Sequence, residues 1–85
     1  MAVITVRITT RTPEQARQPV LYRLGKDFNV VPNIRRAQIT EDFGWAEVDL
    51  EGPLEEVQRA IAWLETTGLG VDALQRSVGK DTVNL

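Results

Sequence analysis

The chain has 85 residues, and its ten basic and twelve acidic residues give a formal net charge of −2. This length fits one domain with a thin core, and the slight acidic excess disfavours a general nucleic-acid binder. The absence of cysteine and histidine excludes disulfides, iron–sulfur clusters, ordinary zinc sites and catalysis by either residue. Oligomerisation is the support that remains for so small a domain, so we expect a homodimer or a larger assembly.

The N-terminal third predicts a strand followed by a helix. Residues 3–10 alternate between apolar and polar side chains, which is typical of a half-buried strand. The apolar positions are Ile4, Val6 and Ile8, and the polar positions are Thr5, Arg7 and Thr9. Thr12 and Gln15 have the spacing of a capping box. We nevertheless place the main helix at 19–28, with a loose turn at 13–17, because Pro19 is tolerated at a first helical position but not inside a helix.

The remainder predicts a hairpin, a second helix and a last strand. The expected elements are a strand at 30–40, a connection at 41–44, a strand at 45–50, a helix starting at Pro53, a left-handed stop at Gly68 and a shorter strand at 69–75. Leu54, Val57, Ala60, Ile61 and Leu64 form the apolar stripe of that helix. We expect one domain over residues 1–78 and a C-terminal tail over 79–85.

The element order β-α-β-β-α-β predicts an α+β fold of the ferredoxin-like kind. Two right-handed crossovers joined by a hairpin give a four-stranded antiparallel sheet of order 4-1-3-2, with both helices on one face. The other face is expected to lack a helical cover. On the predicted parity it carries Thr5, Arg7, Thr9, Trp45, Glu47 and Asp49.

Trp45 is the unusual residue on this open face, and two interpretations remain. In the first interpretation, Trp45 is an interface residue, because tryptophan is enriched in buried interface cores. Alternatively, it stacks on an arginine neighbour such as Arg7 or Arg36. The first interpretation makes the open face a protein–protein interaction surface.

An RNA-binding interpretation rests on the third strand. Residues 43–50 partly match the RNP1 motif of RNA-recognition domains, which share this element order. However, Phe43 stands where a basic residue is expected, and Glu47 replaces the central stacking aromatic. RNA is therefore the third-ranked ligand class, and we do not expect nucleic acid as a partner.

Polar residues of the second strand are candidate ligand contacts. Strict alternation predicts that one of Arg35 and Arg36 points toward the helices and snorkels to water, or else pairs with an anion such as an amino-acid carboxylate. Asn33 either satisfies the local backbone or presents its amide to a ligand. The carboxylates form no catalytic pair, no glycine-rich phosphate loop occurs, and we expect no enzyme activity, cofactor or metal.

Several segments together resemble the NIL domain, the regulatory module at the C-terminus of methionine-importer ABC ATPases, which also occurs fused to small ferredoxins. The matching segments span residues 3–76. They include Gln18-Pro19-Val20-Leu21, Phe28-Asn29-Val30, Asn33-Ile34-Arg35 in place of the namesake motif, Arg36-Ala37-Gln38-Ile39, Ala60-Ile61-Ala62-Trp63-Leu64-Glu65 and Gly68-Leu69-Gly70-Val71-Asp72-Ala73-Leu74.

The resemblance implies the ferredoxin-like fold, pairing of two domains and binding of methionine, with Asn33 at the position of the family's binding asparagine. Ile34 and Arg35 complete the motif, but Arg35 replaces its leucine and would abolish or reshape an apolar pocket. Neither the ATPase nor the ferredoxin is part of this sequence. We therefore expect a stand-alone, non-enzymatic regulatory domain that binds methionine or a similar amino acid as a homodimer.

We expect the compartment to be the cytoplasm. The N-terminus lacks the basic start and long apolar run of a signal peptide, and no stretch approaches the length of a membrane helix.

Overall fold

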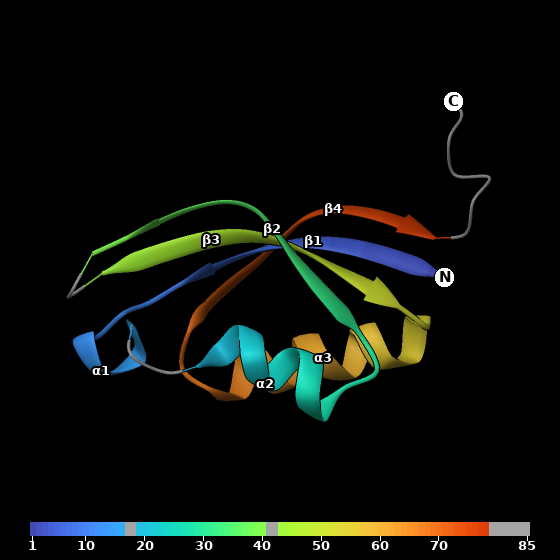
Figure 1. Cartoon of the computed structure of the whole chain (residues 1–85), viewed down its shortest axis with the longest axis horizontal. Coiled ribbons are helices and arrows are strands. Elements are labelled where there is room, and N and C mark those ends of the chain that lie inside the picture. The colour runs from blue at the N-terminus through green and yellow to red at the C-terminus, as the bar shows by residue number, and fades with distance from the viewer. Residues whose placement is uncertain (17–18, 41–42, 79–85) are drawn as a thin grey trace.

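The computed structural model describes residues 1–16, 19–40 and 43–78, which form an open sheet with helices on one face (Figure 1). The strands are β1 (Ala2–Thr9), β2 (Val31–Ile39), β3 (Gly44–Gly52) and β4 (Gly70–Val78). The helices are α1 (Pro13–Ala16), α2 (Val20–Asp27) and α3 (Leu54–Thr66). All strand pairs are antiparallel and the order is β2-β3-β1-β4. The predicted α+β architecture and strand order are confirmed.

The region before α2 contains more structure than a loose turn. Residues Pro13–Ala16 form the one-turn helix α1, and the Thr12 hydroxyl accepts a hydrogen bond from the backbone N–H of Gln15. The Gln15 side chain reaches back to the backbone N–H of Arg11, so the capping box is present with its return bond moved by one residue. Pro19 separates this turn from α2, as the cost of an internal proline requires.

Prolines and a glycine mark the helix ends, but the prediction that Pro19 and Pro53 are the first residues of their helices is off by one position. Pro19 and Pro53 each lie one residue before a helix, and their carbonyls accept the first helical hydrogen bonds, from Arg23 and Val57. Gly68 follows α3 with φ of 86°, the left-handed conformation expected of a helix stop.

Strand β4 is longer than predicted. It continues to Val78 because β1 offers a pairing partner as far as Ala2, which lies opposite Val78. Residues 79–85 of the predicted tail and residues 41–42 of the predicted hairpin connection lie outside the described residues.

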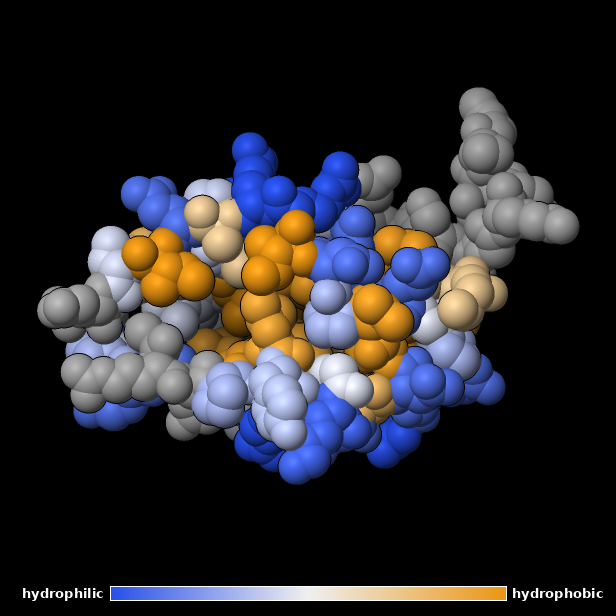
Figure 2. All heavy atoms as spheres, in the orientation of Figure 1, coloured by the Kyte–Doolittle hydropathy of each residue, from blue (hydrophilic) through white to orange (hydrophobic). Residues whose placement is uncertain are grey.

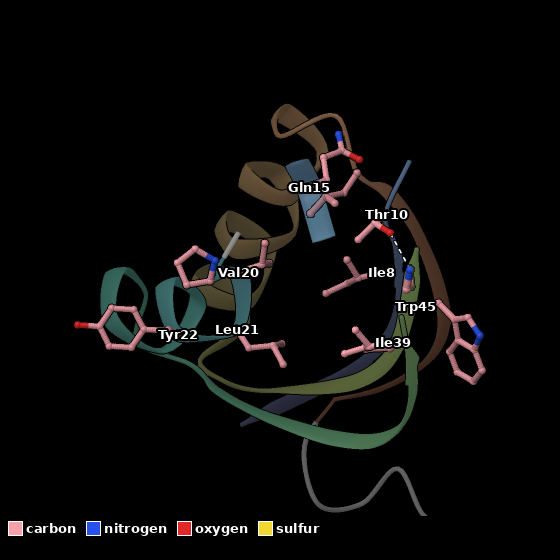
Figure 3. Close-up of a pocket in the computed structure, with 12 residues that line it drawn as sticks. Ile8, Thr10, Gln15, Val20, Leu21, Tyr22, Ile39 and Trp45 are labelled. Carbon is pink, nitrogen blue, oxygen red and sulfur yellow. Dashed lines mark hydrogen bonds between the residues drawn. The ribbon is translucent and has the colours of Figure 1, made fainter. Parts of the chain in front are cut away.

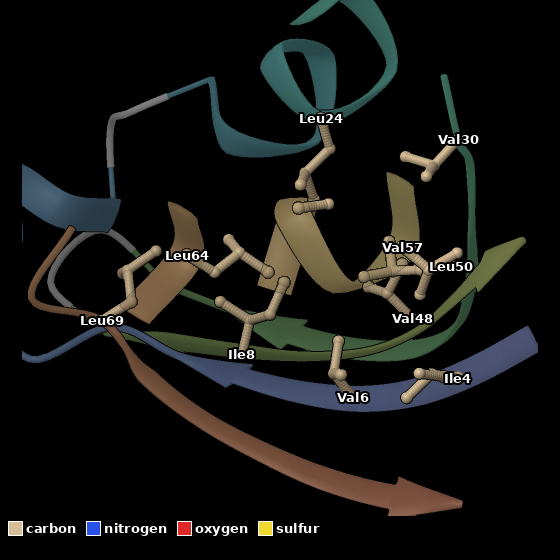
Figure 4. Close-up of a cluster of buried hydrophobic side chains, with 11 residues drawn as sticks. Ile4, Val6, Ile8, Leu24, Val30, Val48, Leu50, Val57, Leu64 and Leu69 are labelled. Carbon is tan, nitrogen blue, oxygen red and sulfur yellow. The ribbon is translucent and has the colours of Figure 1, made fainter. Parts of the chain in front are cut away.

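The core lies between the helices and the inner face of the sheet (Figure 4). The alternating residues Ile4, Val6 and Ile8 of β1 point into it, as predicted. Leu24 of α2 and Leu64 of α3 are fully buried above them. The remaining buried members are Val30, Val48, Leu50, Val57, Ala60 and Leu69.

Strand β2 is one of the two edge strands of the sheet, and β4 is the other. Only β3 pairs with β2, and the residues of β2 are exposed except for the half-buried Pro32. Three of its apolar side chains, Val31, Ile34 and Ile39, are more than half exposed. Figure 2 shows apolar surface on this side of the molecule, around β2 and α2.

Candidate functional site

Two places on the described structure offer side chains for binding. One is the open face, the sheet surface opposite the helices, which carries Thr5, Arg7, Trp45, Glu47 and Asp49 as predicted. The other is a hollow beneath the sheet beside α2, which we call the α2 cleft.

Glu47 is the centre of the open face. Its carboxylate accepts hydrogen bonds from Arg7 Nη2 at 2.8 Å and from Arg36 Nε at 2.6 Å. Arg36 reaches it because the two residues are directly opposite in the β2–β3 register. The hydrogen bond from Arg36 and then that from Arg7 lower the pKa of Glu47, against the opposing effect of desolvation, and the same contact raises the pKa of Arg36. Glu47 therefore binds two guanidinium groups from strands on either side of β3.

Trp45 stacks on the same arginines. The guanidinium carbon of Arg7 lies 4.5 Å from the Trp45 ring centroid and that of Arg36 lies 6.0 Å away. The Nε of Arg7 is buried and has no hydrogen-bond partner among the described residues. The stacking interpretation of Trp45 is thus seen in the structure, while its role as an interface residue stays a prediction.

A bulge corrects the predicted orientation of the arginine pair. The β2–β3 register shifts between Ile34 and Arg36, so Arg35 is the extra residue of a β-bulge. Its Nη1 lies 3.8 Å from Oδ1 of Asp49, and it lines a shallow depression of the open face together with Arg36. The prediction that one arginine turns toward the helices is wrong, because the additional residue returns both side chains to one face.

The charges of the open face are mixed. Register places Glu51 and Asp72 on the same face as Glu47 and Asp49, opposite Val3 and Arg7 respectively. These four carboxylates lie on the same face of the sheet as Arg7, Arg35 and Arg36. A surface for nucleic acid is expected to carry a basic excess, so this arrangement does not favour RNA.

The three motif residues do not form one site within a single chain. Asn33 lies opposite Asp49 and is exposed on the open-face side of β2. Ile34 lies opposite the core residue Val48 and is 55% exposed on the helix side. Neither the α2 cleft nor the open-face depression is lined by Asn33 or Ile34, whereas Arg35 lines the depression. The motif is therefore split between the two faces of an edge strand.

The α2 cleft was not predicted from the sequence. It has a volume of about 260 Å³. In Figure 3, Val20 and Leu21 of α2 face Ile8 and Ile39 of the sheet across the hollow. The Tyr22 ring and the Trp45 indole point away from it. The remaining lining residues are Thr10, Gln15, Pro19, Gly44, Ala46 and Leu69.

Small residues and a helix break create this cleft. On β3, Gly44 and Ala46 supply little side-chain volume to the floor, and Ala46 lies opposite Ile8 on the helix side of the sheet. Above them the helical layer is divided at Pro19 between α1 and α2. These features are visible in the sequence, but the empty space between them depends on distances that the sequence does not give.

The described part of the chain was also searched for acidic clusters and for long apolar helices. Residues 1–16, 19–40 and 43–78 contain no group of three or more acidic side chains placed to hold a metal ion. Within the same ranges no helix is both long and apolar enough to cross a membrane.

Comparison with known proteins identifies the fold class first. A crystal structure of the C-terminal domain of an ABC transporter ATP-binding protein from Enterococcus faecalis superposes with a TM-score of 0.73. It is 20% identical, and the match covers 84% of this chain and 82% of that one. Both are therefore domains of the same α+β fold. No curated protein matches the sequence.

The family follows from the sequence match. The model of the NIL domain family matches residues 4–73, most of the chain. The chain belongs to the NIL domain family, and the resemblance noted in the sequence is confirmed.

Proposed function

We propose that this chain is a non-enzymatic regulatory domain that binds methionine or a similar amino acid as a homodimer. Membership of the NIL family is the observation that carries the proposal. The fold is similar to that of the C-terminal domain of an ABC transporter ATP-binding protein, and this similarity supports a regulatory role toward another protein. The absence of cysteine and histidine from the sequence is consistent with a binding role.

Asn33 is the proposed polar anchor of the ligand. Its amide offers both donors and an acceptor, and it is exposed on an edge strand beside the bulge. Arg35 stands on the same face, so a guanidinium is available for an amino-acid carboxylate. Ile34 offers an apolar surface on the other side of the strand. A second copy that packs against β2 would complete a pocket that one chain supplies only in part.

Thermal unfolding with amino acids tests this proposal. A ligand bound only by the folded dimer raises the unfolding midpoint by mass action, about 2.7 kcal/mol at a hundredfold excess over its dissociation constant. Millimolar L-methionine is expected to raise the midpoint, and D-methionine to raise it much less. Asn33→Ala should abolish the response. Gln38→Ala is the matched control, since Gln38 is an exposed amide on the same strand, opposite Trp45. A flat response across all amino acids would reject methionine sensing.

A protein-interaction module is the second candidate function. It is supported by the uncovered open face, where the half-buried Trp45 is held by Arg7 and Arg36. A rigid aromatic of this kind suits an interface core. Trp45→Ala should then weaken self-association or partner binding in sedimentation experiments. If the association state of this variant is unchanged, the open face is not an interaction surface.

A further inference from the structure

The open face holds a carboxylate beside the two side chains proposed to bind the amino acid. Asp49 of β3 lies directly opposite Asn33 of β2, and its Oδ1 is 3.8 Å from Nη1 of Arg35. Given the amino-acid binding proposed above, on which this inference rests, we propose that Asp49 binds the α-ammonium group of the ligand. The site then takes free, zwitterionic α-amino acids and rejects relatives that lack the charged amino group.

Glu47 and Asp49, two neighbouring carboxylates on this face of β3, differ in how fully their charges are matched. Glu47 accepts hydrogen bonds from two guanidinium groups, at distances between 2.6 and 3.2 Å. Among the described residues, Asp49 accepts a hydrogen bond only from the neutral hydroxyl of Thr5. Its contact with Arg35, at 3.8 Å, is too long for a hydrogen bond. Asp49 is therefore the carboxylate that can still accept hydrogen bonds from a cation.

A buried hydroxyl holds Asp49 in place. Thr5 of β1 is paired with Asp49 in the β1–β3 register and is only 6% exposed. Its Oγ1 donates a hydrogen bond to Oδ1 of Asp49 at 2.6 Å. The Asp49 side chain is 28% exposed, so the held carboxylate remains accessible from solvent. A side chain that is already fixed loses little conformational freedom when it binds a ligand.

The charges around Asn33 are separated along the strands in the way that a zwitterion requires. Glu51 follows Asp49 on the same face of β3, toward the end of the strand. Arg35 lies on the other side of Asp49, at the bulge. The ammonium and carboxylate groups of an α-amino acid are attached to the same carbon, so they can contact Asp49 and Arg35 together. This complementarity sets the orientation of the ligand, with its amino group toward the carboxylates and its acid group toward the guanidinium.

The same arrangement discriminates against deaminated acids. The probe γ-(methylthio)butyrate is methionine without its α-amino group, so it keeps the side chain and the carboxylate. At this site it would leave Asp49 without its cationic partner and would bring a second negative charge close to it. Juxtaposed like charges and unpaired polar groups are the usual means by which a binding site rejects a close relative of its ligand.

Calorimetric titration of the full chain with L-methionine and γ-(methylthio)butyrate at neutral pH tests the inference. The wild type should bind L-methionine at least tenfold more tightly than the deaminated acid. Asp49→Asn should weaken L-methionine about 10–100-fold, the worth of a hydrogen bond to a charged group. The same variant should bind the deaminated acid as tightly as the wild type or more tightly, because the repelling charge is gone. Asp72→Asn is the matched control, since it removes an exposed carboxylate of the same face on β4 and should change neither affinity.

Thr5 is a positioning residue in this arrangement, and it provides a second variant. Thr5→Val resembles threonine in shape but removes the hydroxyl that holds Asp49. It should weaken L-methionine severalfold and leave the deaminated acid unchanged, whereas a merely structural role would affect both ligands alike. Thr5→Ser keeps the hydroxyl and should restore the affinity for L-methionine.

The outcomes distinguish a failure of this inference from a failure of the proposed function. If the wild type binds no amino acid, the proposed function fails, and the inference fails with it. If L-methionine binds and Asn33→Ala abolishes the binding, the proposed function holds. The inference alone is then overturned if the wild type binds γ-(methylthio)butyrate as tightly as L-methionine, or if Asp49→Asn keeps the wild-type affinity for L-methionine. Equal losses of both ligands in Asp49→Asn would give Asp49 a structural role and would overturn it as well.

Discussion

Two glycine-to-alanine substitutions should change stability in opposite directions. Gly52 ends β3, and a Cβ there would lie 2.6 Å from the carbonyl oxygen of Asn29 and 3.3 Å from the Cα of Val30. Both are backbone atoms, so the chain leading into β2 must move. Overpacking of this kind costs about 1–3 kcal/mol. Gly25 is exposed within α2, and its nearest neighbour would be Pro32 Cδ at 3.6 Å, an ordinary contact. Alanine there should gain about 0.5–1 kcal/mol through helix propensity.

Thermal unfolding followed by circular dichroism measures the difference. At about 4–8 °C per kcal/mol for a domain of this size, Gly52→Ala should lower the midpoint by roughly 5–20 °C. Gly25→Ala should raise it by roughly 2–8 °C. Equal shifts of the two variants, or a fully stable Gly52→Ala, would show that the end of β3 does not pack against the Asn29–Val30 backbone.

Substitutions at three further positions test the electrostatics, the core and the helix stop. Arg36 and Arg7 lower the folded pKa of Glu47, so the stability it provides is present above about pH 4.3, the ordinary glutamate value, and is lost as pH falls through the lower folded pKa. Glu47→Gln should flatten the acid limb of a plot of urea midpoint against pH, and an unaltered limb would contradict this assignment. Because Leu64 is fully buried, Leu64→Ala should lower the free energy of unfolding in urea by about 2–5 kcal/mol. Leu64→Met should lower it by less than about 1.5 kcal/mol. Similar decreases for the two variants would argue against tight packing at this position. Gly68→Ala should cost about 1–2 kcal/mol because φ is 86°, and a neutral effect would mean that this turn relaxes.

The architecture was predictable because local signals agreed with one another. The alternation of Ile4, Val6 and Ile8 indicated a half-buried strand, and Pro19, Pro53 and Gly68 marked helix ends where their backbone restrictions are tolerated or required. Each of these signals depends only on residues that are close in the sequence, so strands and helix ends can be predicted from it. Their order then left few topologies for a chain of this length.

The orientation of the arginine pair was not predictable in this way. A bulge at Arg35 needs no glycine or proline, and nothing in Ile34-Arg35-Arg36 marks the extra residue. Its presence depends on the pairing of β2 with β3. Once it is placed, the same arginines that alternation would separate lie together on the open face.

The α2 cleft escaped prediction for a different reason. Its walls come from residues as distant in sequence as Ile8, Val20 and Ile39, and each of them alone is an ordinary apolar residue. Whether such side chains touch or leave a gap depends on how far α2 stands from the sheet. Periodicity assigns residues to a face, but it does not give the spacing between layers.

Sedimentation equilibrium with and without L-methionine tests the central claim most directly, because it reports the dimer and its ligand together. If the amino acid binds a pocket completed by two copies, saturating L-methionine must tighten the monomer–dimer equilibrium. We expect the weight-average mass to rise toward that of the dimer with L-methionine, to rise less with D-methionine and not to rise in Asn33→Ala. A mass that is unchanged by L-methionine at every protein concentration, together with an unchanged thermal midpoint, would contradict the central claim.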